Sequence, residues 1–385
     1  MLFQHVCLES FGYTLPDEVV TTDEIEQRLA PVYQRLRLPE GRLELITGVR
    51  ERRFWPPGMP PSEKSVESGE AAIQAAQIDR HEIGALIHAS VCRDHLEPAT
   101  ACSVHHRLDL RPDCQVYDIS NACLGLLNGA VQVASMIELG QIRAGLVVGT
   151  ESSRSLVETT IEQLNRDTSL TRQDIKYAIA SLTIGSGSCA ILLTHRDLSR
   201  TGNRLLGGVA AANTKFHRLC HSGRDEAGGD AMRPLMQTDS ERLMAEGIAT
   251  GAETFAMFLQ EFGWTRQNVH KAFSHQVGPT HRRLLFDALQ MDTAIDYPTV
   301  ELLGNTGSVA LPLSMALGIE QGWLTRNDKV ALLGIGSGIN CLMLAVDWQR
   351  AAVEPQPLQA PHALRSRSPA KLSTVSPEFQ NTNRR

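Results

Sequence analysis

Residues 118–129 read DISNACLGLLNG and place one cysteine, Cys123, between two apolar runs of different character. The run from Cys114 to Ile119 is rich in β-forming residues, and the run from Leu124 to Leu139 has the period of a helix. A thiol at such a turn lies at the positive end of the helix dipole, where free backbone N–H groups favour the thiolate. The stretch therefore predicts that Cys123 is a nucleophile with a lowered pKa.

A histidine and an asparagine follow downstream in comparable settings. His275 comes after an apolar run typical of a strand, and Asn305 lies in a Gly-Asn-Thr-Gly turn that opens a helical run. Taken alone, His275 would be a hydrogen-bonded structural residue and Asn305 a helix cap. Together with Cys123, in this order, they favour acyl transfer through a thioester. His275 and Asn305 would then donate hydrogen bonds to the enolate of a second substrate.

A glycine-rich run at residues 332–340, LLGIGSGIN, is the candidate for completing an oxyanion hole. We expect the backbone N–H of Cys123 to supply one donor and that of Gly338 the other, because glycines let the backbone come close to a substrate. Ser337 would contact the substrate. A dinucleotide-binding loop is the alternative, and it fails because Asn340 to Val346 is typical of a strand and no helix follows.

Strands and helices alternate along most of the chain, which indicates an α/β fold with largely buried sheets. The expected strands are Ala85 to Val91, Gln115 to Ile119, Ala144 to Gly149, Ser188 to Leu193, Ala272 to His275, Val330 to Leu333 and Asn340 to Val346. The expected helices are Ser65 to Ile78, Leu124 to Leu139, Thr250 to Phe262, Thr280 to Leu289 and Val309 to Gly318.

Two halves can be drawn: residues 1–194 carry the cysteine, and residues 195–348 carry the histidine and the asparagine. No sequence repeat relates them. Residues 217–237, rich in Gly and Asp, indicate a flexible surface insertion. Pro, Ser and Arg dominate residues 349–385, so we expect a disordered tail there.

Composition argues against several function classes. The 385 residues include 37 basic and 43 acidic side chains, a net charge of -6, so nothing global points to nucleic acid or to an anionic membrane. No apolar run reaches the roughly 18 to 20 residues of an integral membrane segment, and the start lacks the pattern of a signal peptide. We therefore expect a cytoplasmic protein whose partners are small molecules or proteins.

The 8 cysteines contain no C-x-x-C pair, so we expect neither a disulfide framework nor a zinc site. Four of them are expected to be small core residues: Cys92, Cys114, Cys189 and Cys341. A metal cluster is an alternative for four residues whose irregular spacing favours scattered surface positions instead: His195, His217, Cys220 and His221. No metal and no cofactor are expected.

These motifs resemble those of the thiolase-superfamily condensing enzymes of the ketoacyl synthase III group. Cys123, His275 and Asn305 match the Cys-His-Asn triad of that group. Within it, the chain is most similar to the OleA family, thiolases that join two fatty acyl-CoA molecules head to head. The further matching stretches are MLFQ at 1–4, RDHLEPAT at 93–100, NACL at 121–124 and LLGIGSGINC at 332–341.

The resemblance runs from Met1 to about Trp348 and implies a five-layered αβαβα thiolase fold built from two structurally duplicated halves. It also implies an obligate homodimer and a fatty acyl chain held in buried tunnels. The substrates would be thioesters of CoA or of acyl carrier protein.

The resemblance gives Glu97 a role as the base that reaches across the dimer into the partner subunit's active site. From the residues alone, Glu97 would be a solvated loop residue before Pro98. A Claisen step without decarboxylation must remove a Cα proton, and a carboxylate beside an apolar tunnel is made a stronger base by desolvation.

Three other functions remain open. Two are condensations: joining of carrier-bound chains into a pyrone or resorcinol, and malonyl-dependent extension by a 3-oxoacyl synthase III. The third is a non-catalytic thiolase-fold partner that only binds an acyl chain, against which the intact triad argues.

Overall fold

The structure, a computed structural model, describes residues 1–223 and 235–353. Its strands are β1 (Val6–Thr14), β2 (Glu18–Thr21), β3 (Glu51–Phe54), β4 (Ile83–Ala89), β5 (Gln115–Ile119), β6 (Ala144–Glu151), β7 (Gly187–His195), β8 (Arg204–Ala212), β9 (Cys220–Ser222), β10 (Met236–Thr238), β11 (Lys271–Ser274), β12 (Lys329–Gly336) and β13 (Asn340–Asp347).

The α-helices are α1 (Thr22–Arg28), α2 (Ala30–Leu36), α3 (Arg42–Thr47), α4 (Pro61–Ala76), α5 (Thr100–Arg107), α6 (Gly125–Glu138), α7 (Arg154–Arg166), α8 (Arg172–Ala178), α9 (Ser240–Phe262), α10 (Pro279–Leu289), α11 (Val300–Leu303) and α12 (Ala310–Glu320). Two 3-10 turns lie at the site described below, η2 (Ala122–Leu124) and η8 (Gly307–Val309).

Nine strands form one hydrogen-bonded array in the order β11-β12-β13-β8-β1-β7-β6-β4-β5. The five strands from β1 to β5 in that order precede residue 196, and the other four follow residue 203. The N-terminal segment joins the two groups through the pair of Cys7 with Arg204, the bridge of Leu2 with Gly207, and a backbone hydrogen bond from Phe3 to Leu206 at 2.9 Å. The array is therefore two sheets, one from each half of the chain, joined along the N-terminal segment.

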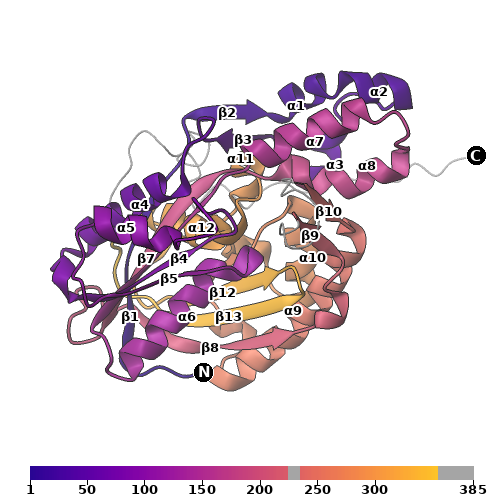
Figure 1. Cartoon of the computed structure of the whole chain (residues 1–385). Coiled ribbons are helices and arrows are strands. Elements are labelled where there is room, and N and C mark those ends of the chain that lie inside the picture. Colours follow the sequence, from indigo (N-terminus) through magenta and orange to yellow (C-terminus); the bar gives the residue numbers. More distant parts are fainter. Residues whose placement is uncertain (224–234, 354–385) are drawn as a thin grey trace, which may run out of the picture.

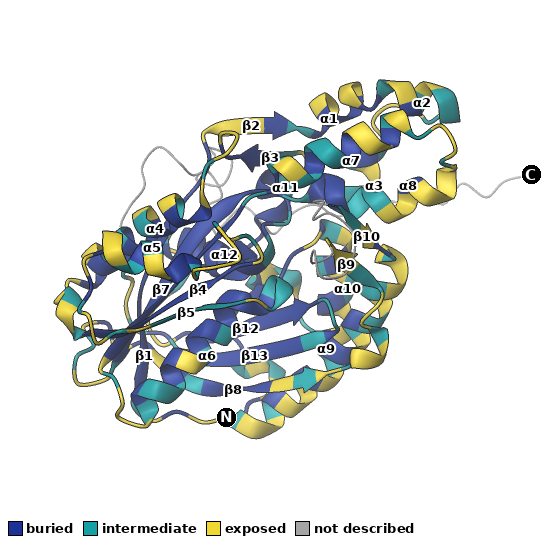
Figure 2. Ribbon diagram, viewed as in Figure 1, coloured by how far each residue is buried: buried dark blue, intermediate teal, exposed yellow. Residues whose placement is uncertain are grey.

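Side-chain alternation along these strands separates the core into layers. Ile87 and Leu332 point into a central cluster with residues of α6 and α12, so these two helices lie between the sheets. Leu86 packs outward in a cluster with α4 and α5, and Leu333 packs outward in a cluster with α9 and α10. The five layers are thus helix, sheet, helix, sheet, helix, as Figures 1 and 2 show.

A small helical subdomain stands beside these layers (Figure 1). Its members are α1, α2, α3, α7 and α8, with the hairpin of β2 and β3, and it has its own apolar cluster that includes Ile25, Val32 and Ile161. The sequence analysis did not predict it, because its helices are short and mostly polar.

All seven expected strands and all five expected helices are present at closely matching positions. One helix is longer, since α9 begins at Ser240 rather than Thr250. Two central strands were missed. β1 contains the buried Glu9, whose charge breaks the apolar pattern, and β8 is mostly glycine and alanine, which have low strand propensity.

The two segments with unusual composition are described only in part. Within residues 217–237, β9 pairs with β10, and residues 224–234 lie outside the described residues. Residues 349–353 of the expected tail are held on the fold: Asn203 accepts N–H bonds from Gln349 and Arg350 at 2.7 and 2.9 Å, and Ala352 accepts one from Phe11 at 3.1 Å. The expected start of the tail at Gln349 is therefore too early, and residues 354–385 are outside the described part.

Cys189 and Cys341 are buried as expected, whereas Cys92 and Cys114 are only half-buried. Cys92 lies in the loop after β4, where it contacts Ser152. Within residues 1–223 and 235–353, no helix combines the length and hydropathy needed to cross a bilayer. The same residues contain no group of three or more His, Cys, Asp or Glu side chains arranged to hold a metal ion.

Candidate active site

The candidate site lies at one edge of the first sheet. β4, β5 and β6 run parallel, so their carboxyl ends meet there. β4 leads into the loop that carries Val91 and Glu97, β5 leads into Cys123, and β6 ends at Glu151. Chain segments far apart in the sequence therefore bring polar side chains to the same edge.

Cys123 lies in the tight turn η2, directly before α6. Ala122 has a left-handed φ of 43°, which is uncommon for a residue with a Cβ and marks a strained turn at the nucleophile. Gly336 on β12 faces this turn, and a Cβ there would lie 3.1 Å from Leu124 and 3.7 Å from the Cβ of Cys123. The glycine therefore lets the strand approach the cysteine closely.

The thiol of Cys123 does not have the lowered pKa that the turn predicts. Its pKa is raised to about 12, mainly by burial and to a smaller extent by the nearby groups of Cys220 and Glu151. The backbone N–H groups of Cys123 and Ser337 hydrogen-bond the sulfur and lower the pKa, but burial outweighs them. The expectation of a thiolate is therefore wrong for the free enzyme, because desolvation exceeds the effect of the helix terminus.

The glycine-rich run reaches the sulfur through Ser337, one residue before the expected Gly338. Gly338 has a positive φ of 130°, and a Cβ there would lie 2.6 Å from the side chain of Asn340. Asn340 in turn donates to Asn121 at 3.5 Å, and Asn121 donates to Asn128 at 2.7 Å. These amides tie the run to the turn of Cys123.

His275 follows β11 and is buried, with 4% of its surface exposed. Its backbone N–H donates to Leu333 on β12 at 3.1 Å. Neither ring nitrogen has a hydrogen-bond partner among the described residues, and burial lowers its pKa to about 3, with a smaller contribution from His281. His275 is therefore a neutral imidazole in a dry site, with both nitrogens available.

Asn305 is fixed by its backbone and by one end of its side chain. Its N–H donates to Thr183 at 2.9 Å, and its carbonyl accepts from Gly185 at 2.9 Å. Its side-chain oxygen accepts the N–H of Gly307 at 3.0 Å, so the amide orientation is set and the NH₂ end supplies donors.

The turn of Cys123 contacts both segments that carry the other two residues. η2 packs against η8, which begins two residues after Asn305, and against β12, which pairs with the strand that leads into His275. The structure thus brings together the segments that carry or adjoin Cys123, His275 and Asn305. Glu97 is exposed in the loop between β4 and α5.

Comparison with known proteins identifies the family to which the chain belongs. Residues 259–348 match the C-terminal domain of 3-oxoacyl-[acyl-carrier-protein (ACP)] synthase III. The acyl-CoA:acyl-CoA alkyltransferase of Shewanella oneidensis is 42% identical over 90% of this chain and 100% of that protein, and the one of Xanthomonas campestris is 32% identical over the same shares. This chain belongs to the acyl-CoA:acyl-CoA alkyltransferase family.

Solved structures of this family have the same fold. A variant of Xanthomonas campestris OleA with bound lauric acid and lauroyl-CoA is 32% identical, has a TM-score of 0.84 and covers 90% of this chain and 100% of its own. The cerulenin-bound OleA is 33% identical, with a TM-score of 0.85, and covers 90% and 98%. The chain is therefore a transferase with the thiolase fold.

Two residues near Cys123 were missed from the sequence. Glu151 closes β6, and the rule that functional groups gather at the carboxyl ends of parallel strands could have found it. Cys220, which was expected at a scattered surface position, is half-buried and contacts Ser337 and Thr238. Cys220 begins β9, which lies outside the main sheet, and no local sequence pattern predicts its position near Cys123.

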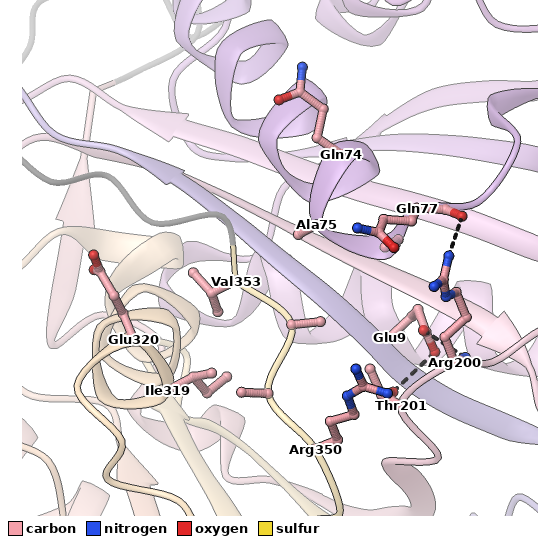
Figure 3. Close-up of a pocket in the computed structure, with 13 residues that line it drawn as sticks. Glu9, Gln74, Ala75, Gln77, Arg200, Thr201, Ile319, Glu320, Arg350 and Val353 are labelled. Atoms are coloured by element: carbon pink, nitrogen blue, oxygen red, sulfur yellow. Dashed lines mark hydrogen bonds between the residues drawn. The ribbon is translucent and has the colours of Figure 1, made fainter.

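The alkyltransferase also has a surface cleft of about 380 Å³ away from these residues (Figure 3). Its lining includes Glu9, Gln77, Arg200 and Arg350. Glu9 already accepts bonds from Ser199 and from the backbone of Arg200, and Arg200 donates to the carbonyl of Gln77. Hydrogen bonds within the fold therefore engage Glu9 and Arg200 in this cleft.

Proposed function

We propose that this enzyme joins two fatty acyl-CoA molecules by Claisen condensation through an acyl thioester on Cys123. The observation that carries the proposal is the setting of Cys123: a strained strand-to-helix turn, two backbone N–H groups on the sulfur, and the segments of His275 and Asn305 packed around it. Homologues that act on two acyl-CoA molecules support the substrate class.

The first step transfers an acyl group. The sulfur of Cys123 attacks the thioester carbonyl, a new C–S bond forms, and the bond to the CoA sulfur breaks. The thiol proton leaves with CoA. The N–H groups of Cys123 and Ser337 are the proposed donors to the oxyanion, in place of the pair with Gly338 expected from the sequence.

The second step forms a carbon–carbon bond. A base removes the Cα proton of a second acyl-CoA, and its enolate attacks the carbonyl of acyl-Cys123. The bond between the acyl carbonyl and the Cys123 sulfur breaks, the sulfur receives the proton that the base removed, and the product is a β-ketoacyl-CoA. The proposed donors to the enolate oxygen are a ring N–H of His275 and the NH₂ of Asn305, both in a buried site where hydrogen bonds are strong.

We assign the base to Glu97 of a partner subunit in a homodimer. The loop of Glu97 projects from the chain with exposed apolar side chains, Val91 at 46% and Leu96 at 56% exposure. β5, next to this loop, is an edge strand with only half-buried side chains. A second subunit against this face would cover the edge strand and desolvate the carboxylate, which strengthens it as a base.

Thioesters of acyl carrier protein and malonyl-dependent extension are the alternatives. A ketoacyl synthase III of Streptomyces coelicolor, 25% identical over 89% of this chain, keeps the second one open. The steps above use two thioesters and residues of the protein, without a cofactor. All 8 cysteines are free, which fits a reducing compartment, and we propose the cytoplasm.

Product analysis tests the proposal. Purified protein is incubated with a single defined acyl-CoA, such as lauroyl-CoA, and the products are identified by mass spectrometry. We expect a β-keto product with twice the acyl carbon count, without malonyl-CoA. A product that forms only with malonyl-CoA, or only from carrier-bound chains, would replace the proposal with the corresponding alternative.

A further inference from the structure

Glu151 is a buried carboxylate where the carboxyl ends of β4, β5 and β6 meet. The proposed steps give this side chain no role. It is 6% exposed and closes β6. Its Oε1 accepts the hydroxyl of Ser308 at 2.6 Å, the N–H of Ser308 at 3.3 Å and the N–H of Val91 at 3.2 Å. A carboxylate costs free energy to bury, and these donors offset that cost.

The donors belong to segments that lead to other residues of the site. Val91 begins the loop that carries Glu97, and Ser308 follows Asn305 by three residues. Gly307, directly before Ser308, has a left-handed φ of 58°, and a Cβ there would lie 3.2 Å from the carboxyl carbon of Glu151. One side chain therefore connects the loop of the proposed base with the turn after Asn305.

Glu151 also acts on Cys123 through its charge. The Glu151 carboxylate raises the pKa of Cys123, and its partner Ser308 lies beside Gly125, two residues after Cys123, where a Cβ on the glycine would be 3.4 Å from the Cβ of Ser308. Cys220 from β9 also raises this pKa, but burial raises the pKa of Cys220 itself, so it is a neutral thiol near neutral pH. Cys92, from the loop after β4, faces the same carboxylate. His275 carries no positive charge near neutral pH, since its pKa is lowered to about 3. Glu151 thus places a negative charge near the nucleophile.

We propose that Glu151 is a positioning residue that fixes the Glu97 loop to the Asn305 turn and keeps Cys123 as a thiol until a thioester binds. This rests on the proposed function. A neutral thiol resists oxidation and adventitious alkylation, and its proton is lost only when the sulfur attacks a substrate. The hydrogen bonds of the same carboxylate hold the segments needed for the second step.

The charge is tested by residue-specific alkylation. Wild-type enzyme and Glu151→Gln are treated with iodoacetamide between pH 6 and 9.5, and modification of Cys123 is followed by peptide mass spectrometry. Glutamine keeps the shape without the charge, so the pKa of Cys123 should fall, and we expect Cys123 to react at least about threefold faster at a given pH. Equal rates would overturn the electrostatic part.

Glu26→Gln is the matched control. Glu26 is another buried glutamate with three hydrogen bonds, from Tyr33, Gly41 and Leu43, but it lies in the helical subdomain. We expect its alkylation profile at Cys123 to equal that of the wild type. A shift as large as that of Glu151→Gln would show a general effect of removing a buried charge, and would overturn the assignment to Glu151.

The positioning is tested with Glu151→Asp, which keeps the charge but withdraws it from Ser308. We expect a wild-type alkylation profile and normal acyl loading, with condensation slowed about tenfold or more. Condensation at the wild-type rate would overturn the positioning role. If Glu151→Asp does not fold, Ser308→Ala tests the same contact: slowed condensation with normal loading supports the positioning role, and an unchanged rate overturns it.

These results can be separated from failure of the proposed function. Acyl loading of Cys123 is measured in the same preparations of wild-type enzyme. Absence of an acyl adduct would overturn the proposed condensation, whereas the alkylation profile reports on Glu151 and Cys123 without any acyl substrate.

Discussion

Cys123 has a helix N-terminus that favours the thiolate and a dry surrounding that favours the thiol. Its pKa, raised to about 12, shows that burial is the larger effect in the free enzyme. The sequence predicts the first effect from the turn itself, but it cannot predict the second. Burial of the thiol depends on distant segments that pack around the turn, such as β12, where a Cβ on Gly336 would lie 3.7 Å from the Cβ of Cys123.

Replacement of the nucleophile gives the first prediction. Cys123→Ala and Cys123→Ser should both abolish acyl loading, because alanine has no nucleophile and a serine hydroxyl ionises far less readily than a thiol. Intact-protein mass spectrometry after incubation with acyl-CoA should show an adduct on the wild type and on the control Cys114→Ala. An adduct on Cys123→Ala would mean that another residue is acylated.

His275 and Asn305 should separate loading from condensation. If they hold the enolate of the second substrate, His275→Ala and Asn305→Ala should still load Cys123, while condensation slows by about 10²- to 10³-fold, the usual cost of one lost oxyanion donor. Loading is read from intact mass and condensation from product formation, with the exposed His270→Ala as control. Equal loss of both steps would indicate a structural role.

Buried histidines should make the fold sensitive to acid. Burial lowers the pKa of His275 to about 3 and those of His88 and His281 to about 4, against an ordinary value of 6.5. Between these limits the unfolded chain binds more protons, so stability is present above pH 6.5 and is lost as the pH falls towards 4. The free energy of unfolding, measured with urea, should be lower at pH 5 than at pH 7.5. In His281→Gln the difference between the two pH values should be smaller.

At the scale of elements, the hydrophobic pattern of the sequence predicts buried strands well and irregular contacts between distant segments poorly. The strands around the site were found because they are apolar throughout, as parallel strands covered on both faces must be. β1 was not, because Glu9 interrupts it. The burial of this carboxylate depends on hydrogen bonds donated by Ser199, Arg200 and Thr201, which lie 190 to 192 residues further along the chain. Hydrophobic periodicity along a short stretch of sequence cannot indicate a contact between segments so far apart.

The segment after β13 provides the element-scale prediction. Asn203 is fully buried, and both ends of its side chain bond to residues 349 and 350. Ending the chain after Trp348 removes the partners of the Asn203 oxygen and of the N–H of Phe11, and leaves the Asn203 NH₂ with its bond to Leu8. The cost is about 1–3 kcal/mol for each buried group left unpaired. We expect a clear drop in Tm for this truncation. Ending the chain after Val353 should leave Tm and condensation unchanged, and thermal unfolding of both truncations measures this.

At the scale of the whole molecule, the layered arrangement could be predicted only in part. Alternating strands and helices predict an α/β fold, but the placing of α6 and α12 between two sheets depends on pairing between β1 and β8, neither of which has a clear pattern. The five layers were expected from the resemblance alone. The resemblance also supplied Glu97, which is exposed here and gives no local sign of chemistry.

Assembly therefore gives the last prediction, which concerns the proposed base. A Claisen step without decarboxylation must remove a weakly acidic Cα proton, whereas a malonyl substrate loses CO₂ and needs no such base. Glu97→Gln keeps the size and hydrogen-bonding reach of the side chain but not its basicity. We expect this variant to form acyl-Cys123 and to fail in condensation. Full condensation by Glu97→Gln alone would exclude Glu97 as the base.

Mixed dimers test where the base acts. In a dimer of one Cys123→Ala and one Glu97→Gln subunit, a base that crosses the interface completes one of the two sites, because the subunit with an intact cysteine receives the glutamate of its partner. Two inactive proteins should then regain part of the wild-type activity on mixing. If Glu97 instead served its own subunit, no site would contain both groups. Tagged subunits purified as verified mixed dimers should therefore show product formation, and inactive mixed dimers would place the base within a single subunit.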